Sequence, residues 1–183
     1  MLQKCSAWRV LEVFFNDPKP QGEGFSLSEI SRQSDLAHTS VKNHLQALEE
    51  NGLIITSEKS AGERTYPVYS ANWESEKFRH YKLIDTLYRI RESGLLETLQ
   101  KKTTPDCIIL FGSAARGEDL RDSDVDLYLQ CGEKSLDLST YEDSLKRNIQ
   151  LHFQPDFNSY PPALRNNIVN GIVLYGYLTA YEE

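Results

Sequence analysis

Hydrophobic residues in the first part of the chain recur at helical spacing in two separate runs, and a helix-start signal lies between them. Residues 6–15 place apolar side chains three and four positions apart, which is typical of one face of a helix. A second helix is predicted over residues 27–33, because Ser26 and Glu29 stand at the spacing of a capping box. A third is predicted over residues 39–50, where apolar positions repeat at i, i+4 and i+7. These signals together predict three short helices.

The next segment has the pattern of a β-hairpin. Residues 53–56 and 64–69 are rich in β-branched and aromatic side chains, and the polar stretch 58–63 between them predicts the turn. Helices followed by a hairpin are typical of a winged helix-turn-helix, and residues 45–54 add the pattern LxxLExxGLI. On these features, residues 5–72 resemble the winged-helix domains of small prokaryotic transcription regulators.

A helical connector and a second domain are expected beyond this segment. Residues 73–102 carry an apolar stripe, interrupted at residues 93–94, that we expect to pack either between domains or in a homodimer. The stripe consists of Phe78, Tyr81, Ile84, Leu87 and Tyr88. Further strands are expected at residues 107–111, 123–129, 148–153 and 171–176, and helices at 139–147, capped by Ser139 and Glu142, and 161–170. The expected organisation is a winged helix at residues 1–72, a connector at 73–104 and a second domain at 105–183, in the α+β class.

Composition and charge narrow the classes of function. The chain has 183 residues, of which 39% are hydrophobic and 26% charged, so we expect one or two folded domains rather than disorder. No apolar run is long enough for a membrane helix, and we expect no membrane partner. The three cysteines lack the paired spacing of a zinc site, which favours free thiols in a cytoplasmic protein. The net charge of −7 disfavours a protein that coats nucleic acid through bulk positive charge, although a local site remains open.

Two neighbouring features carry the candidate chemistry. Gly112 and Ser113 follow a strand-length apolar run, where a tight turn lets backbone amides approach a phosphate. Asp124 and Asp126 stand two positions apart on the next predicted strand, so their carboxylates project from the same face. Two carboxylates beside a phosphate site suit Mg²⁺, which is commonly shared between carboxylates and substrate phosphates.

The string GSAARGEDLRDSDVDLYL, residues 112–129, resembles the signature of the minimal nucleotidyltransferases in the polymerase-beta-like superfamily. The resemblance implies a small mixed-sheet domain in which Asp124 and Asp126 bind two Mg²⁺ ions in the active enzyme. It also implies that the nucleoside triphosphate, expected to be ATP, is contacted by Gly112, Ser113, Arg116 and Ser123. The implied activity is transfer of a nucleoside monophosphate, expected to be AMP, to a protein or small acceptor.

The sequence departs from this family at one position. The family has a third carboxylate on a later strand, whereas residues 148–153 contain Gln150 and His152 but no acid. His152 is therefore our candidate for proton abstraction, with a structural role as the alternative. Fused chains of this size resemble a prokaryotic, especially archaeal, type, and relatives of the catalytic domain serve as antitoxins that modify a toxin partner.

A second function belongs to a different class. The predicted third helix would enter a DNA groove, with the hairpin touching the backbone. The candidate DNA-binding residues are Thr39, Ser40, Lys42, Asn43, His44, Lys59 and Arg64. The chain would then be a DNA-binding transcriptional regulator with a nucleotide-sensing or catalytically impaired transferase domain. The remaining alternative is a winged helix used for dimerisation or protein contact.

Overall fold

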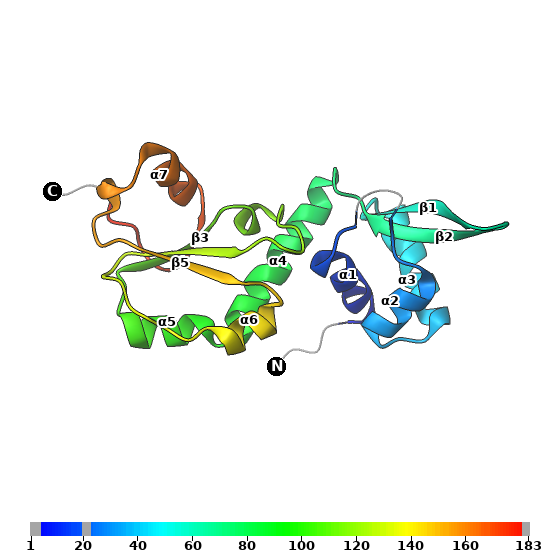
Figure 1. The fold of residues 1–183 in the computed structure, drawn as a ribbon, viewed down its shortest axis with the longest axis horizontal. Coiled ribbons are helices and arrows are strands. Elements are labelled where there is room, and N and C mark those ends of the chain that lie inside the picture. The colour runs from blue at the N-terminus through cyan, green and yellow to red at the C-terminus, as the bar shows by residue number, and fades with distance from the viewer. Residues whose placement is uncertain (1–4, 20–22, 181–183) are drawn as a thin grey trace. The chain divides into compact units, whose positions relative to one another are not determined.

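The computed structural model describes residues 5–19 and 23–180 of the chain (Figure 1). The chain divides into two compact units, Met1–Asp85 and Thr86–Glu183. The division falls inside helix α4, Glu76–Glu92. The predicted connector, residues 73–104, is therefore shared between the two units.

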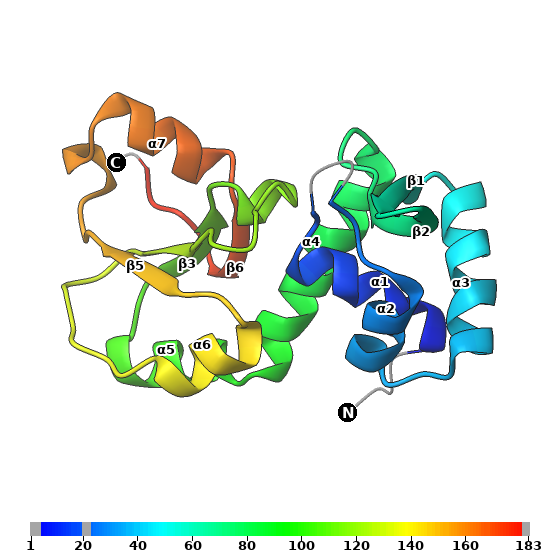
Figure 2. The same cartoon turned by 45° about the vertical axis from the view of Figure 1, so that its right-hand side comes forward.

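Over residues 5–19 and 23–85, the first unit shows three helices followed by a two-stranded antiparallel hairpin and the beginning of α4 (Figure 2). These elements are α1 (Ser6–Asn16), α2 (Leu27–Ser34), α3 (His38–Glu50), β1 (Ile54–Ala61) and β2 (Arg64–Ala71). The apolar faces of the helices meet in one core, which includes Val10, Phe14, Ile30, Val41 and Leu45. This is the order of elements expected for residues 5–72, because the helical spacing of apolar residues decides which face is buried.

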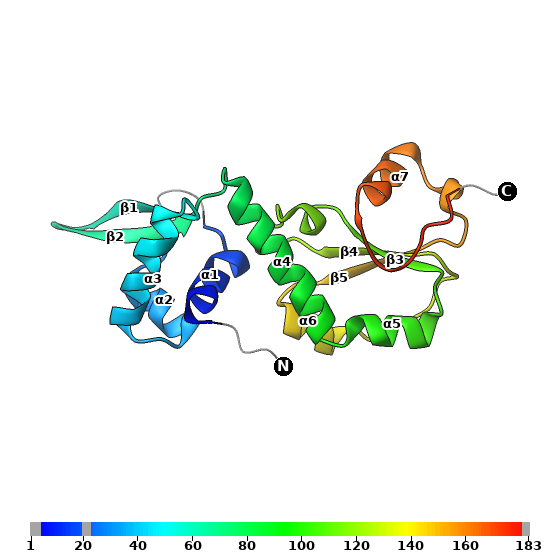
Figure 3. The ribbon, with the colours of Figure 1, turned by 180° about the vertical axis from the view of Figure 1, so that it is seen from behind.

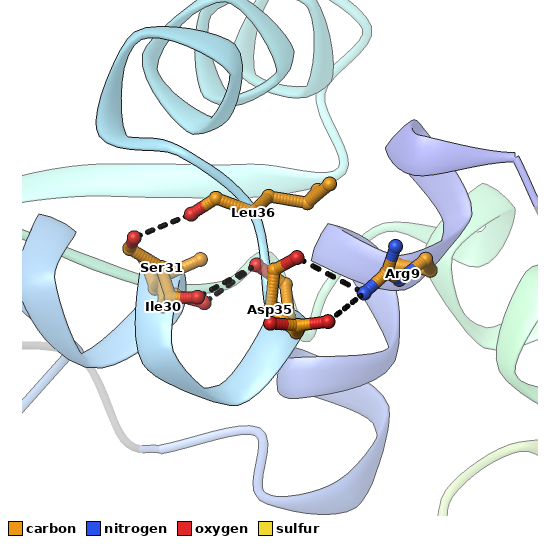
Figure 4. Close-up of polar contacts among 6 residues, drawn as sticks. Arg9, Ile30, Ser31, Asp35 and Leu36 are labelled. Atoms are coloured by element: carbon orange, nitrogen blue, oxygen red, sulfur yellow. Dashed lines mark hydrogen bonds and ion pairs between the residues drawn. The ribbon is translucent and has the colours of Figure 1, made fainter.

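The corner between α2 and α3 is fixed by polar contacts to the backbone (Figure 4). Asp35 ends α2 in the left-handed conformation, with a φ of 52°. Its carbonyl oxygen and carboxylate accept hydrogen bonds from Arg9 at 3.1 and 3.3 Å. Ser31 donates its hydroxyl to the carbonyl of Leu36. The direction in which α3 leaves this corner is thus set by α1 and α2.

The hairpin is longer than the sequence pattern predicted. Residues 58–61, expected in the turn, continue β1, and Lys59 pairs with Tyr66 across the ladder. The turn is reduced to Gly62 and Glu63, with Gly62 at a φ of +63°. Backbone pairing extends through exposed polar residues that carry no hydrophobic signal, which is why the pattern placed the turn too early.

The capping box of α2 provides a first prediction. The backbone N–H and hydroxyl of Ser26 each donate to Glu29 Oε2 at 2.7 Å, and these contacts hold the pKa of Glu29 below its usual range. Ser26→Ala is expected to destabilise the first unit by about 1 kcal/mol near neutral pH. Because the pKa of Glu29 is lowered, its contribution is present above the usual carboxyl pKa and is lost as the pH falls through the folded value.

Both tryptophans, Trp8 and Trp73, lie in the first unit, so urea unfolding followed by tryptophan fluorescence measures this effect. The control is Ser28→Ala, which changes an exposed serine within the same helix. A difference between Ser26→Ala and the wild type that stays constant down to acid pH would contradict the capping role.

The second unit is built on a four-stranded mixed sheet in the order β5-β4-β3-β6. Strand β3 pairs antiparallel with β4 and β6, whereas β4 and β5 are parallel. The strands are β3 (Cys107–Phe111), β4 (Val125–Leu129), β5 (Ile149–Phe153) and β6 (Ile172–Gly176). The helices α5 (Leu95–Thr103) and α6 (Ser139–Leu145) lie on one side of the sheet and α7 (Pro162–Val169) on the other (Figures 1 and 3). The predicted α+β class with a small C-terminal mixed sheet is confirmed.

Burial within the second unit explains this arrangement. Every residue of β3 is buried, which fits the continuous apolar run and a strand covered on both faces. On the α7 side, Ile109 and Tyr128 pack with Ile168. Leu95, Leu96 and Leu99 of α5 are also fully buried. The central strands, which lead into the candidate site, are therefore held firmly in place.

Helix α4 departs from its expected stripe. Phe78 is buried, but Ile84 is 51% exposed, while Lys82 and Asp85 are almost fully buried. Trp8 donates its indole N–H to Asp85 Oδ1 at 2.9 Å, so a polar contact occupies a position that hydrophobicity alone does not mark.

Among the described residues, no helix is both long and apolar enough to cross a bilayer.

Candidate active site

The turn after β3 brings Gly112, from the predicted phosphate-binding turn, beside Asp126, from the predicted pair of metal ligands. Gly112 has a φ of +74°, and a Cβ atom built on it would lie 2.7 Å from Asp126 Oδ2. Glycine is therefore required both by the backbone conformation and by the close approach of the carboxylate. The residues after this turn form a three-residue 3₁₀ turn, η1 (Ala114–Arg116). Hydrogen bonds from the Arg116 and Glu118 amides to the Ser113 carbonyl hold it.

Gly112→Ala is expected to lower the affinity for a metal–nucleotide complex by about tenfold or more, because the methyl group displaces Asp126 from its place. Backbone strain adds a stability loss of about 1–3 kcal/mol. Titration calorimetry with Mn²⁺ and a non-hydrolysable ATP analogue, together with urea unfolding, measures both effects.

Two matched glycines separate strain from displacement. Gly94→Ala has a similar positive φ but no neighbour near its Cβ, so we expect a stability loss with unchanged affinity. Gly132→Ala has neither feature and is expected to change little. Equal loss of affinity in Gly94→Ala and Gly112→Ala would contradict the role of the close approach.

The two candidate metal ligands stand at the beginning of β4. Asp126 lies within the strand and Asp124 directly precedes it, and both side chains are partly exposed. Val125, Leu127 and Leu129 are buried, as the alternation of the strand predicted. The alternate positions of Asp124 and Asp126 place both carboxylates on one face, and the Asp126 carboxylate reaches the Gly112 turn.

Strand β5 contributes His152 and Gln150 to the same region. His152 Nε2 lies 3.1 Å from Asp126 Oδ1, and its ring packs edge-on against Phe111 with centroids 5.0 Å apart. Gln150 is the register partner of Asp126 in the parallel ladder. Strand β5, which contains no acid, therefore lies beside Asp126 and presents the imidazole of His152 and the amide of Gln150 to it.

The other two predicted nucleotide ligands have contacts inside the loop. Arg116 is exposed and forms an ion pair with Glu118, 2.6 Å between Nε and Oε2. Ser123 accepts a hydrogen bond from the Leu120 amide at 2.9 Å through its hydroxyl. Arg116 can exchange this exposed partner for a phosphate at little cost, whereas the Ser123 hydroxyl helps to shape the loop.

Two residues that the sequence patterns did not single out also touch this region. Asn148 donates its side-chain amide to Asp124 Oδ1 at 3.2 Å. Arg147 Nε lies 3.5 Å from Asp119 Oδ2, with both side chains nearly buried. Burial lowers the pKa of Arg147. These contacts join segments more than twenty residues apart, and no local pattern reports such a pairing.

The predicted capping box at Ser139 is wrong in its details. Leu138 is the N-cap of α6, and the carboxylate of Asp137 accepts from the amide and hydroxyl of Ser139. The Glu142 carboxylate instead accepts the Ile149 amide at 3.0 Å. Asp137 supplies the turn acceptor two positions before Ser139, which leaves Glu142 to fix the beginning of β5.

A polar cavity of about 510 Å³ opens beside these residues. Its lining comprises Arg121, Asp122, Ser123, Ser139, Glu142, Asp143, Lys146, Arg147 and Asn148. Ser123 and Asn148 belong both to this lining and to the surroundings of Asp124. The volume is within the range of small-molecule sites, and the lining suits a hydrophilic ligand.

The donor set fits a divalent cation shared with a substrate. Within the part of the chain that the structure describes, no three His, Cys, Asp or Glu side chains group as a metal site. Asp124 and Asp126 offer two carboxylates, and Mg²⁺ is usually bound by one or two carboxylates together with phosphates and water. The residues present therefore fit Mg²⁺ that arrives with a nucleotide better than a permanently bound ion.

The candidate DNA-binding residues lie on helix α3 and on both strands of the hairpin, β1 and β2. Thr39, Lys42 and Asn43 are exposed on α3, while Ser40 is half-buried. Lys59 and Arg64 are exposed on the hairpin strands. His44 is half-buried and lines a mainly apolar cavity of about 300 Å³ with Trp8, Leu11 and Tyr81. His44 thus borders the helices of its own unit as well as solvent.

Comparison with known proteins gives one family. Residues 94–177 match the family model described as "Polymerase beta, Nucleotidyltransferase". This match supports the nucleotidyltransferase superfamily for the second unit, and nucleotidyl transfer with a nucleoside triphosphate and a divalent metal as its general chemistry. No curated protein and no solved structure matches the chain significantly.

Proposed function

We propose that the protein is a Mg²⁺-dependent nucleotidyltransferase that transfers AMP from ATP to a hydroxyl group of a protein or small acceptor. The observation that carries the proposal is the contact region of Gly112 and Asp126, with Asp124 on the same face, inside the segment matched by the family. The glycine turn lies against the Asp126 carboxylate. A bound metal–triphosphate requires carboxylates for the metal and free backbone amides for the phosphates, and a turn of this kind can offer such amides.

Each residue of the candidate site would have a separate role in binding the metal–nucleotide complex. Asp124 and Asp126 hold the cations, Gly112 and Ser113 present backbone amides to the triphosphate, and Arg116 pairs with a phosphate oxygen. Bound Mg²⁺ supplies charge stabilisation to the attacking and leaving oxygens. The acceptor oxygen forms a bond to the α-phosphorus, the bond between the α-phosphorus and the bridging oxygen breaks, and pyrophosphate leaves. We assign the acceptor proton to the His152 imidazole, which contacts Asp126.

Isotope position in ATP tests the proposal directly. With Mg²⁺ and lysate fractions as acceptors, label in the α-phosphate should appear in an acceptor, while label in the γ-phosphate should appear only in pyrophosphate. EDTA should stop both. Transfer of the γ-label would identify a kinase, and label in neither acceptor nor pyrophosphate would remove the enzymatic proposal.

The acceptor proposed first is a protein, as in an antitoxin that modifies a toxin partner in the cytoplasm. Acceptor fractions treated with protease before and after the reaction distinguish a protein from a small molecule. If the labelled product is already a small species before protease is added, and protease does not change it, the acceptor is a small molecule.

Gln150 offers a gain-of-function prediction. Because Gln150 is the register partner of Asp126, Gln150→Asp places a third carboxylate beside the proposed metal site. We expect Mn²⁺ affinity in the presence of the ATP analogue to rise by about tenfold. Gln150→Asn has the same side-chain size without the charge and serves as the control. An equal effect of both variants, or weaker binding in Gln150→Asp, would contradict the placement.

A DNA-binding regulator is the second candidate function. It is favoured by the exposed α3 residues Thr39, Lys42 and Asn43 and by Lys59 and Arg64 on the hairpin. Binding to the DNA upstream of its own gene should weaken steeply with salt, and Lys59→Ala should reduce the slope of log affinity against log salt by about one. An undetectable isotherm at low salt would remove this candidate.

A further inference from the structure

The loop between η1 and β4 carries Ser123 and Asp124 but has no helix or strand of its own. Residues 117–124 are irregular. Its shape therefore cannot come from regular backbone ladders and must come from specific contacts. Within the loop, the Glu118 amide donates to the Ser113 carbonyl, and Leu120 and Ser123 bond to each other. These contacts define local turns but leave open what holds the loop against the sheet.

The first external contact is made by Arg147. Its Nε lies 3.5 Å from Asp119 Oδ2, and the two side chains are only 8% and 6% exposed. A buried carboxylate or guanidinium without its partner is costly, so the two groups must stay together. Asp119 is in the first half of the loop, and this contact fixes that half.

The second external contact is made by the next residue, Asn148. Its carbonyl accepts the Val125 amide at 2.8 Å, and its side-chain amide donates to Asp124 Oδ1 at 3.2 Å. Asn148 therefore holds the backbone directly after Asp124 and one oxygen of its carboxylate. A neutral amide does this without neutralising the charge that a cation needs, and the carboxylate has a second oxygen for the metal.

We infer that Arg147 and Asn148, consecutive residues before β5, are positioning residues that clamp both ends of the loop and so preorganise Asp124 for a divalent cation. The inference rests on the proposed function for the identity of the ligand. Hydrogen-bond partners of metal-ligating carboxylates orient the ligand, and their loss typically costs 10–100-fold in metal affinity. The parallel pairing of β4 with β5 brings this pair of residues to the loop.

The experiment uses the full chain with two measurements. The first is Mn²⁺ affinity by calorimetry with the non-hydrolysable ATP analogue, where Asn148→Ala should bind about tenfold more weakly. The second is hydrogen exchange of the peptide covering residues 117–126, which should become faster in Asn148→Ala and in Arg147→Lys without any metal. The control Asn170→Ala removes a similar amide contact, to Asn166 on α7, and should change neither quantity.

The two measurements distinguish failure of the inference from failure of the proposed function. Unchanged loop exchange in both variants would overturn the clamp, whether or not metal binds. Faster exchange in both variants, with no Mn²⁺ binding by the wild type, would retain the clamp and remove the metal–nucleotide function. Faster exchange with unchanged Mn²⁺ affinity would overturn the positioning role of Asn148. Arg147→Lys retains the charge, so the loop can be tested in a folded chain.

Discussion

Replacing Asp124 and Asp126 together by alanine is expected to lower nucleotidyl transfer by about a thousandfold or more while the second unit stays folded. Both side chains lie at the start of β4 and are partly exposed, so their removal creates no apolar cavity. Without them the cations have no protein ligand, and the transition state loses its main charge stabilisation. The rate of transfer of the α-phosphate label measures the activity, and far-UV circular dichroism measures folding.

A control for this prediction must remove the same net charge elsewhere in the unit. Glu92→Ala with Glu133→Ala removes two exposed carboxylates, one from the end of α4 and one from a loop, and should leave the transfer rate unchanged. Transfer by the Asp124→Ala, Asp126→Ala variant at the rate of this control would overturn the proposed site. Loss of transfer in both variants would instead trace the effect to overall charge.

The fold was predictable wherever the spacing of apolar residues indicates which face of an element is buried. Helices α1 and α3 follow from the spacing of apolar residues, because each buries one face, and β3 follows from a continuous apolar run, because both of its faces are buried. The predictions were wrong where polar residues determine the structure. β1 continues through Lys59, Asp137 rather than Ser139 provides the turn acceptor at α6, and Asp85 occupies a buried position of α4.

Some residues of the candidate site could be predicted from the sequence and others could not. Gly112, Asp124 and Asp126 could be identified from the sequence because they lie close together along the chain and their spacing has a direct geometric meaning. Asn148 and Arg147 could not, because their contacts depend on the parallel register of β4 with β5. Sequence patterns thus locate the residues that perform the chemistry more readily than those that hold them in place.

Asp119→Asn is expected to destabilise the second unit by about 3–5 kcal/mol, since it leaves the guanidinium of Arg147 in a nearly buried site without its carboxylate partner. Burial already lowers the pKa of Arg147, which shows that desolvation acts against its charge. Tryptophan fluorescence does not report on the second unit, because both tryptophans lie in the first. Unfolding of the second unit in urea is therefore monitored through hydrogen exchange of peptides from β4 and β5.

Two further variants separate the buried pair from general electrostatics. Asp122→Asn removes an exposed acid near the same arginine and should cost less than about 0.5 kcal/mol. Asp119→Leu combined with Arg147→Met replaces the pair by apolar side chains and should recover most of the stability, because neither charge then remains buried alone. If the double variant is as unstable as Asp119→Asn, the loop depends on the shape and hydrogen bonds of the ion pair as well as on its charge balance. If Asp119→Asn is as stable as Asp122→Asn, the pair contributes nothing to holding the loop.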